Sequence, residues 1–157
     1  MKKNILFIAS IFISIFIISC STSKNATNLK PNRNHLSGTW TISDINVDLP
    51  SGFKITTVFD EAPYDDFKGS TWSLIKNGNG SFTLNNGTKE NIYWGVDGKG
   101  DNAQFEFKKL NGMKPQNVDN GFRLGLGPIS SNSFTATSMI NPGSDSTGTI
   151  TYTFTKK

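Results

Sequence analysis

The chain of 157 residues is poor in two side chains on which many catalytic and metal sites depend, because it contains one cysteine, Cys20, and one histidine, His35. A single cysteine excludes an internal disulfide, and a single histidine excludes most His-rich metal sites and His-activated nucleophiles. His35 precedes the first expected strand, where a preorganised catalytic site is difficult to build. We therefore expect no enzymatic activity, no metal site and no cofactor.

The chain also carries only a small excess of positive over negative charge. The formal net charge is +4, but Lys2 and Lys3 belong to an N-terminal segment that we expect to be removed. Without these two lysines the sixteen basic residues become fourteen, against twelve acidic ones. This balance excludes a broad basic surface, and we expect no nucleic-acid partner.

Long apolar runs are missing from most of the chain and occur only at its start. Residues 5–18 are apolar apart from Ser10 and Ser14. As a helix this run would span about 21 Å, which is less than the roughly 30 Å of a bilayer's hydrocarbon core. A positive start, a short apolar stretch and a small residue at its end are the parts of a secretory signal. We predict a signal peptide over residues 1–19, with a transmembrane anchor as the weaker alternative.

The residues that end this run, Ile17-Ile18-Ser19-Cys20, resemble the lipobox of bacterial lipoproteins. The resemblance implies cleavage before Cys20, a diacylglyceryl group on its sulfur and a further acyl chain such as palmitate on the new N-terminus. Two or three acyl chains hold a protein firmly at a membrane, whereas one does not. The alternative is a free cysteine near an ordinary cleavage site. The polar residues 20–36 then predict a lipid-anchored, flexible tether.

From Gly38 onward, apolar and polar residues alternate with a period of two, which is typical of half-buried strands. Turn signals such as Asn77–Gly80 and Asn86-Gly87 separate the runs. In the first run the apolar residues are Trp40 and Ile42 and then Ile45 and Val47, so the alternation shifts by one residue near Ser43-Asp44. This shift predicts a bulge there. We also expect a strand over residues 53–59.

A helical turn is expected only over residues 60–68, which contain four acids. These acids are most simply a solvated turn, with a Ca²⁺ site as the alternative. The pattern predicts an all-β domain over residues 37–157: an antiparallel up-and-down β-barrel of about 8–10 strands with at most one short helix.

The segment from His35 to Ile42 resembles the opening of lipocalin-like domains, whose first strand begins G-x-W. Gly38 and Trp40 match that motif. The resemblance, to the lipocalin-family lipoproteins of Bacteroidota, covers residues 36–157 and implies that Trp40 closes the base of the barrel. Lipocalins usually carry a basic residue that packs over this Trp, and here the last strand offers Lys156 and Lys157. The resemblance and the missing acidic run after Cys20 favour an outer-membrane lipoprotein that faces the periplasm.

A barrel of about eight strands either fills its interior with side chains or holds one small ligand. The leading hypothesis is a monomeric carrier of a small hydrophobic ligand that is anchored to the membrane by its N-terminal lipid. Its expected lining is Phe59, Trp72, Trp94, Phe107 and Tyr152. The alternative is a solid-cored, non-catalytic interaction or structural module that binds a protein partner through its loops or the Thr-rich last strand. An internal cavity of several hundred Å³ would distinguish the two.

Overall fold

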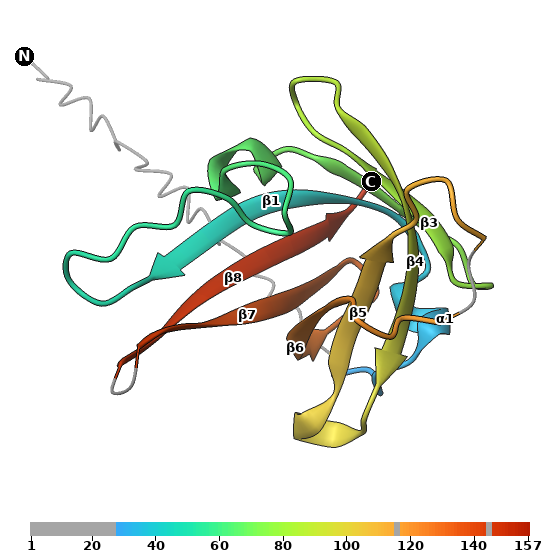
Figure 1. Ribbon diagram of the computed structural model, residues 1–157. Helices are drawn as coiled ribbons and strands as arrows, with labels where there is room; N and C mark the ends of the chain where they lie inside the picture. Colours follow the sequence, from blue (N-terminus) through green and yellow to red (C-terminus); the bar gives the residue numbers. More distant parts are fainter. Residues whose placement is uncertain (1–27, 115–116, 144–145) are drawn as a thin grey trace, which may run out of the picture.

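The computed structural model describes residues 28–114, 117–143 and 146–157, and within them eight antiparallel strands close into a barrel (Figure 1). The strands are β1 Gly38–Asp48, β2 Thr71–Leu74, β3 Asn79–Thr83, β4 Lys89–Asp97, β5 Gln104–Lys109, β6 Phe122–Ile129, β7 Ser133–Gly143 and β8 Ser146–Lys156. Each strand pairs with the next, and β1 also pairs with β8. The predicted all-β, antiparallel up-and-down barrel is confirmed.

The described residues contain three short helical segments: α1 Arg33–Leu36 and the 3₁₀ turns η1 Tyr64–Phe67 and η2 Gly100–Asn102. The turn η1 lies inside the predicted helical segment 60–68 and confirms it, but α1 and η2 lie outside the one segment where a helical turn was expected. Among the described residues, no helix is both long enough and apolar enough to cross a membrane.

The tight turns follow from local sequence. Gly78, between β2 and β3, has φ +95°, and a Cβ there would lie 2.5 Å from the ring of Tyr93. Only glycine accepts both the left-handed backbone and this close approach. The Asn77–Gly80 hairpin signal is therefore confirmed, as is the Asn86-Gly87 turn between β3 and β4.

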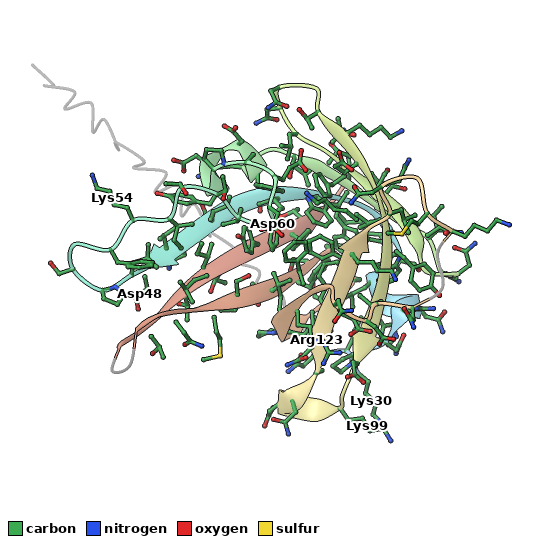
Figure 2. The ribbon with its side chains drawn as sticks, viewed as in Figure 1. Lys30, Asp48, Lys54, Asp60, Lys99 and Arg123 are labelled. Carbon is green, nitrogen blue, oxygen red and sulfur yellow. The ribbon has the colours of Figure 1, made fainter. Side chains whose placement is uncertain are left out.

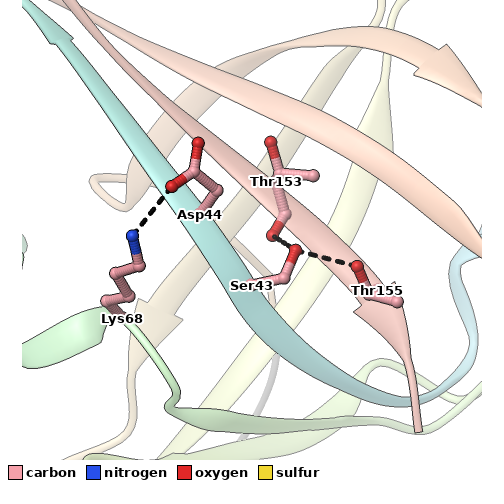
Figure 3. A network of polar contacts seen from close by, with 5 residues as sticks. All are labelled: Ser43, Asp44, Lys68, Thr153 and Thr155. Atoms are coloured by element: carbon pink, nitrogen blue, oxygen red, sulfur yellow. Dashed lines mark hydrogen bonds and ion pairs between the residues drawn. The ribbon is translucent and has the colours of Figure 1, made fainter.

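The predicted bulge in the first strand is confirmed at Ser43, where the register between β1 and β8 shifts between Ile42 and Asp44. Figure 3 shows how the extra residue is satisfied: the Ser43 hydroxyl donates to the carbonyl of Thr153 over 3.2 Å and lies 2.8 Å from the hydroxyl of Thr155. Asp44 pairs with Lys68 at 2.9 Å. Because of the bulge, Ile45 and Val47 return to the side of the core.

The strand predicted over residues 53–59 is wrong. This segment belongs to the long connection 49–70 between β1 and β2, whose only ladder contact is an isolated bridge between Val58 and Ala62. Phe53 closes a turn onto Pro50, and Phe59 and Asp60 both have positive φ. Two successive left-handed residues cannot continue a strand. The alternation does not mark one buried face, because Phe53 and Thr57 are exposed while Phe59 is buried.

The tether predicted over residues 20–36 differs from the structure in its second part. Leu29 donates its N–H to the carbonyl of Ile129 over 2.8 Å, and Leu36 is fully buried. Arg33 donates to the carbonyl of Trp94 over 2.9 Å. Two leucines and one arginine thus hold residues 28–36 on the barrel, although the segment is polar on average. Cys20 and the predicted signal peptide lie outside the described residues.

The core is built mainly from aromatic rings. The largest fully buried side chains are Trp40, Trp72, Trp94, Tyr152, Phe67, Phe82, Phe105, Phe107, Phe134, Phe154, Leu36 and Ile42. These side chains fill the barrel between its two ends. We call the end that carries Trp40 the base, and the opposite end, where the 49–70 connection leaves β1 and enters β2, the mouth.

Candidate functional site

The base of the barrel is closed around Trp40. Its indole N–H donates to the carbonyl of Leu36 over 2.7 Å, and its ring meets Phe134 edge-on at 4.8 Å. The Lys156 ammonium lies 5.2 Å from the Trp40 ring centroid, within the range of a cation–π contact. Gly38 has φ +139°, and a Cβ there would come within 3.2 Å of Lys156. The Gly38-x-Trp40 pair therefore seats Lys156 over the indole.

Four of the five expected lining residues meet at the mouth. Phe59 contacts Trp72 from β2, Phe107 from β5 and Tyr152 from β8. Trp94 lies apart from them: its indole N–H points to the carbonyls of Ile75 and Asn79, at 3.0 and 3.1 Å. The structure thus brings together Phe59, Trp72, Phe107 and Tyr152 but not Trp94.

Phe59 is the centre of this aromatic cluster, although it comes from a connection and not from a strand. Its ring centroid lies within 5.1 to 6.5 Å of those of Phe67, Trp72, Phe107, Phe122 and Tyr152. Only 7% of Phe59 is exposed. Figure 2 labels Asp60, the next residue, beside the ring side chains of the barrel. Phe59 therefore acts as a plug that fills the mouth.

The backbone of the plug is strained. Phe59 has φ +56° and Asp60 has φ +50°, a region that glycine occupies freely and a bulky side chain rarely does. Such residues cost on the order of 1–3 kcal/mol each and persist only where the surroundings hold them. The plug is thus kept in place by neighbouring contacts against its own backbone preference.

Besides the rings around Phe59, Lys109 at the end of β5 holds the residues that follow the plug. Its ammonium donates to the carbonyl of Asp60 over 2.8 Å and to the carboxylate of Glu61 over 3.0 Å. Both side chains of the ion pair are largely buried, with exposed fractions of 15% and 14%. Such a pair is screened less than a surface pair and fixes geometry well. We call the contacts of Lys109 with Asp60 and Glu61 the latch.

Beneath the plug, Tyr152 has an unsatisfied polar atom. Its hydroxyl is buried and has no hydrogen-bond partner among the described residues. Burial also raises the pKa of the Tyr152 phenol well above its ordinary value, so the group keeps its proton. A buried hydroxyl without a partner costs about 1–3 kcal/mol. A strained plug and an unsatisfied hydroxyl are therefore found at the same place in the barrel.

A hollow of about 240 Å³ opens beside the plug and leads to solvent. Its lining is Thr57, Val58, Phe59, Phe122, Arg123, Ser138, Met139 and Ile140. The pairing of β6 with β7 starts at Gly125 and Thr137, so the first residues of β6 have no ladder contact with the outer part of β7. Met139 on that part of β7 is 71% exposed. The hollow is thus a lateral opening in the barrel wall, with the Phe59 side chain in its lining.

The other large hollows lie on the outer surface. One, of about 360 Å³, is lined by mixed charges that include Arg33, Asp97, Glu106 and Arg123. Desolvation raises the pKa of Glu106, while the guanidinium of Arg123, 3.8 Å from its carboxylate, opposes that shift. These charges largely balance one another, so this surface has no clear preference for one ionic ligand.

The calcium alternative for the acids of residues 60–66 is not supported. Within the described part of the chain, no three His, Cys, Asp or Glu side chains group closely enough to hold a metal ion. Glu61 instead pairs with Lys109, which sequence reasoning did not find because the two residues are far apart in the chain. Phe122 was missed for the same reason, because only the folded barrel brings its ring to Phe59. Phe67 lies in the same connection as Phe59 and was missed because its segment was expected to be a solvated turn.

In comparisons with known proteins, no protein-family model, no curated protein and no solved structure matches this chain. The function of the mouth is therefore argued from its own residues: a strained aromatic plug, a latch and a buried donor without an acceptor.

Proposed function

We propose that this protein is a cell-envelope lipoprotein whose barrel binds and carries a small hydrophobic ligand at its mouth, without catalysing a reaction. The lipobox-like residues before Cys20 support the anchor. The position of Lys156 over Trp40 supports the lipocalin-like resemblance, since a basic residue packs over the motif Trp in that family. The observation that carries the ligand site is Phe59: a side chain from a connection, not from a strand, fills the mouth.

The plug favours a carrier because its side chain comes from a connection and not from a strand. Strand side chains such as Trp72 and Tyr152 are fixed by the ladders on both sides of their strands. Phe59 has no ladder pairing, so it can leave the mouth without breaking the barrel. Its withdrawal relieves the left-handed backbone and exposes an apolar, ring-lined site. Apolar cavities of about 150 Å³ stay dry and bind small hydrophobic molecules.

The experiment is native mass spectrometry of residues 21–157, which contain every described element of the barrel. The protein is purified without detergent, before and after delipidation with solvent. We expect an added mass that is lost on delipidation and regained from an envelope lipid extract. A mass that stays that of the bare chain in all three states would overturn the carrier.

The alternative, a solid-cored module that binds a protein partner, is favoured by one observation: aromatic rings fill the interior between base and mouth. One binding mode suggested for this module, pairing of a partner's strand with the last strand, is excluded. β8 pairs with β1 and with β7 and offers no free edge for an added strand. A bare mass throughout the experiment above would favour this module and direct the search to its loops.

A further inference from the structure

We propose that the ligand of this site is a neutral, planar ring that carries a carbonyl oxygen, and that it replaces the ring of Phe59 and accepts a hydrogen bond from Tyr152. This inference rests on the proposed function and names its ligand class. It is carried by the shape of the Phe59 seat, by the absence of charge around it and by the unsatisfied hydroxyl of Tyr152, whose ring contacts that of Phe59.

The seat of Phe59 is shaped for a flat ring. Four neighbouring rings meet Phe59 at steep interplanar angles: 82° for Phe67, 78° for Trp72, 69° for Phe107 and 72° for Phe122. Edge-to-face contacts of this kind are favourable because the positive edge of one ring meets the negative face of another. An aliphatic chain would fill the space but would lose these contacts, so an aromatic or quinone-like ring fits the seat better.

The surroundings of the seat are uncharged. The five rings around Phe59 carry no ionic group, and the nearby ammonium of Lys109 is already engaged by Asp60 and Glu61. Arg123, at the rim of the hollow, has a side chain that is 53% exposed and lies outside the ring cluster. A charged ligand group in the seat would be desolvated without a partner, which is strongly unfavourable. The ring should therefore be neutral.

Tyr152 supplies the polar part of the recognition. Its hydroxyl is protonated and buried, its ring lies 5.3 Å from that of Phe59, and no described residue accepts its proton. A ligand oxygen in the space of Phe59 would satisfy that donor. A site built to hydrogen-bond a ligand discriminates against an analogue that lacks the group, because the buried partner is then left unpaired.

The lateral hollow gives the ligand its path. It contains Phe59 and Phe122 on one side and Ile140 on the other, where β6 and β7 do not pair. The latch of Lys109 holds the plug until a ligand competes for the seat. The apparent affinity of the wild type is therefore the affinity of the open site multiplied by the fraction of molecules in which the plug is withdrawn.

The test compares acetophenone with ethylbenzene, two molecules of similar size that differ in the carbonyl oxygen. Isothermal titration calorimetry is run on residues 21–157 as wild type, Phe59→Ala and the double variant Phe59→Ala with Tyr152→Phe. We expect Phe59→Ala to bind acetophenone about 3- to 10-fold more tightly than ethylbenzene, the value of one hydrogen bond. The double variant leaves the acetophenone carbonyl without a donor and should bind acetophenone more weakly than ethylbenzene. The wild type should bind both molecules more weakly than Phe59→Ala.

Equal affinity of Phe59→Ala for the two molecules would overturn the carbonyl preference while leaving the hydrophobic carrier intact. A folded Phe59→Ala protein that binds neither molecule, with a bare mass in native spectrometry, would overturn both proposals. If Phe59→Ala does not fold, Glu61→Gln opens the latch and keeps the plug. This variant should bind acetophenone several-fold more tightly than the wild type, whereas Asp66→Asn, an exposed acid in η1, should not. Equal affinity of Glu61→Gln and wild type would contradict the role of the plug.

Discussion

Single residues at the mouth carry two kinds of cost side by side. Phe59 and Asp60 occupy left-handed backbone, and the hydroxyl of Tyr152 is buried without a partner. Proteins keep such costs where a binding event or a movement uses them. Each cost can be removed separately, so each gives its own prediction for the ligand-free protein.

Tyr152→Phe removes the unpaired hydroxyl and keeps the ring. The free energy of unfolding should rise by about 1 kcal/mol, because the desolvation cost of the hydroxyl disappears. Urea denaturation of the delipidated protein measures this change. Tyr93→Phe is the matched control and should change stability little, since its hydroxyl is not a buried unpaired group. A loss of stability in Tyr152→Phe would show that the hydroxyl has a partner after all.

Asp60→Gly replaces a left-handed Asp by the residue that prefers this backbone. Lys109 contacts the main-chain carbonyl of Asp60, and this contact survives the substitution. We expect the midpoint of thermal unfolding to rise, with a gain of up to about 1 kcal/mol. Asp65→Gly in η1, where φ is not positive, should lower the midpoint instead. A lower midpoint for Asp60→Gly would contradict the strain.

At the scale of elements, the connection 49–70 has little ladder pairing, and its main-chain bonds to β1 are those of Gly69 and Ser70 with Ile42. Its internal ladder consists of the Val58–Ala62 bridge, and its tie to β5 is the latch. The barrel strands by contrast are paired on both sides. Segments with few ladder bonds open at lower free energy than paired strands. The connection is therefore the part of the described chain best suited to move.

Glu61→Gln should loosen this connection. Removing one charge of a largely buried pair leaves the Lys109 ammonium poorly compensated. The amide protons of Val58 and Glu61, which are bonded within the connection, should exchange faster with solvent while those of β4 and β8 stay unchanged. Hydrogen-exchange mass spectrometry measures this, with Asp66→Asn as the control. Unchanged exchange at Val58 and Glu61 would rule out the latch.

The elements also show how far sequence reasoning reached. The bulge at Ser43 and the turn at Gly78 were predicted because each is decided by neighbours in the chain. The 53–59 segment was misread because its residues alternate as a strand does, although in the folded protein Phe53 and Thr57 are exposed. Residues 28–36 were assigned to the tether because one buried and one half-buried leucine, Leu36 and Leu29, count little in a polar average. The latch joins residues that only the closed barrel brings together, so no local pattern reveals it.

At the scale of the whole molecule, the two ends of the barrel differ. The base is sealed by Trp40, which is fully buried, hydrogen-bonded and covered by Lys156. The mouth is closed by side chains of the connection 49–70, with Phe59 at the centre of the ring cluster. We propose that the first is a permanent seal and the second a removable one, which is the asymmetry that a carrier needs.

Trp40→Ala tests the permanent seal. The substitution removes a fully buried indole and should lower the free energy of unfolding by about 3–5 kcal/mol. Thr39→Ala, an exposed neighbour on the same strand, is the control and should cost far less. Urea denaturation gives both values. A cost below about 1 kcal/mol for Trp40→Ala would contradict its role at the base.

The most direct test of the central claim compares wild type and Phe59→Ala by native mass spectrometry after both delipidated proteins meet the same envelope lipid extract. If Phe59 is a plug that competes with the ligand, Phe59→Ala should carry the same added mass as the wild type at higher occupancy. Circular dichroism confirms that both proteins are folded. Equal occupancy in the two proteins, or a bare mass in both, would contradict the claim that the mouth of this barrel is a ligand site closed by Phe59.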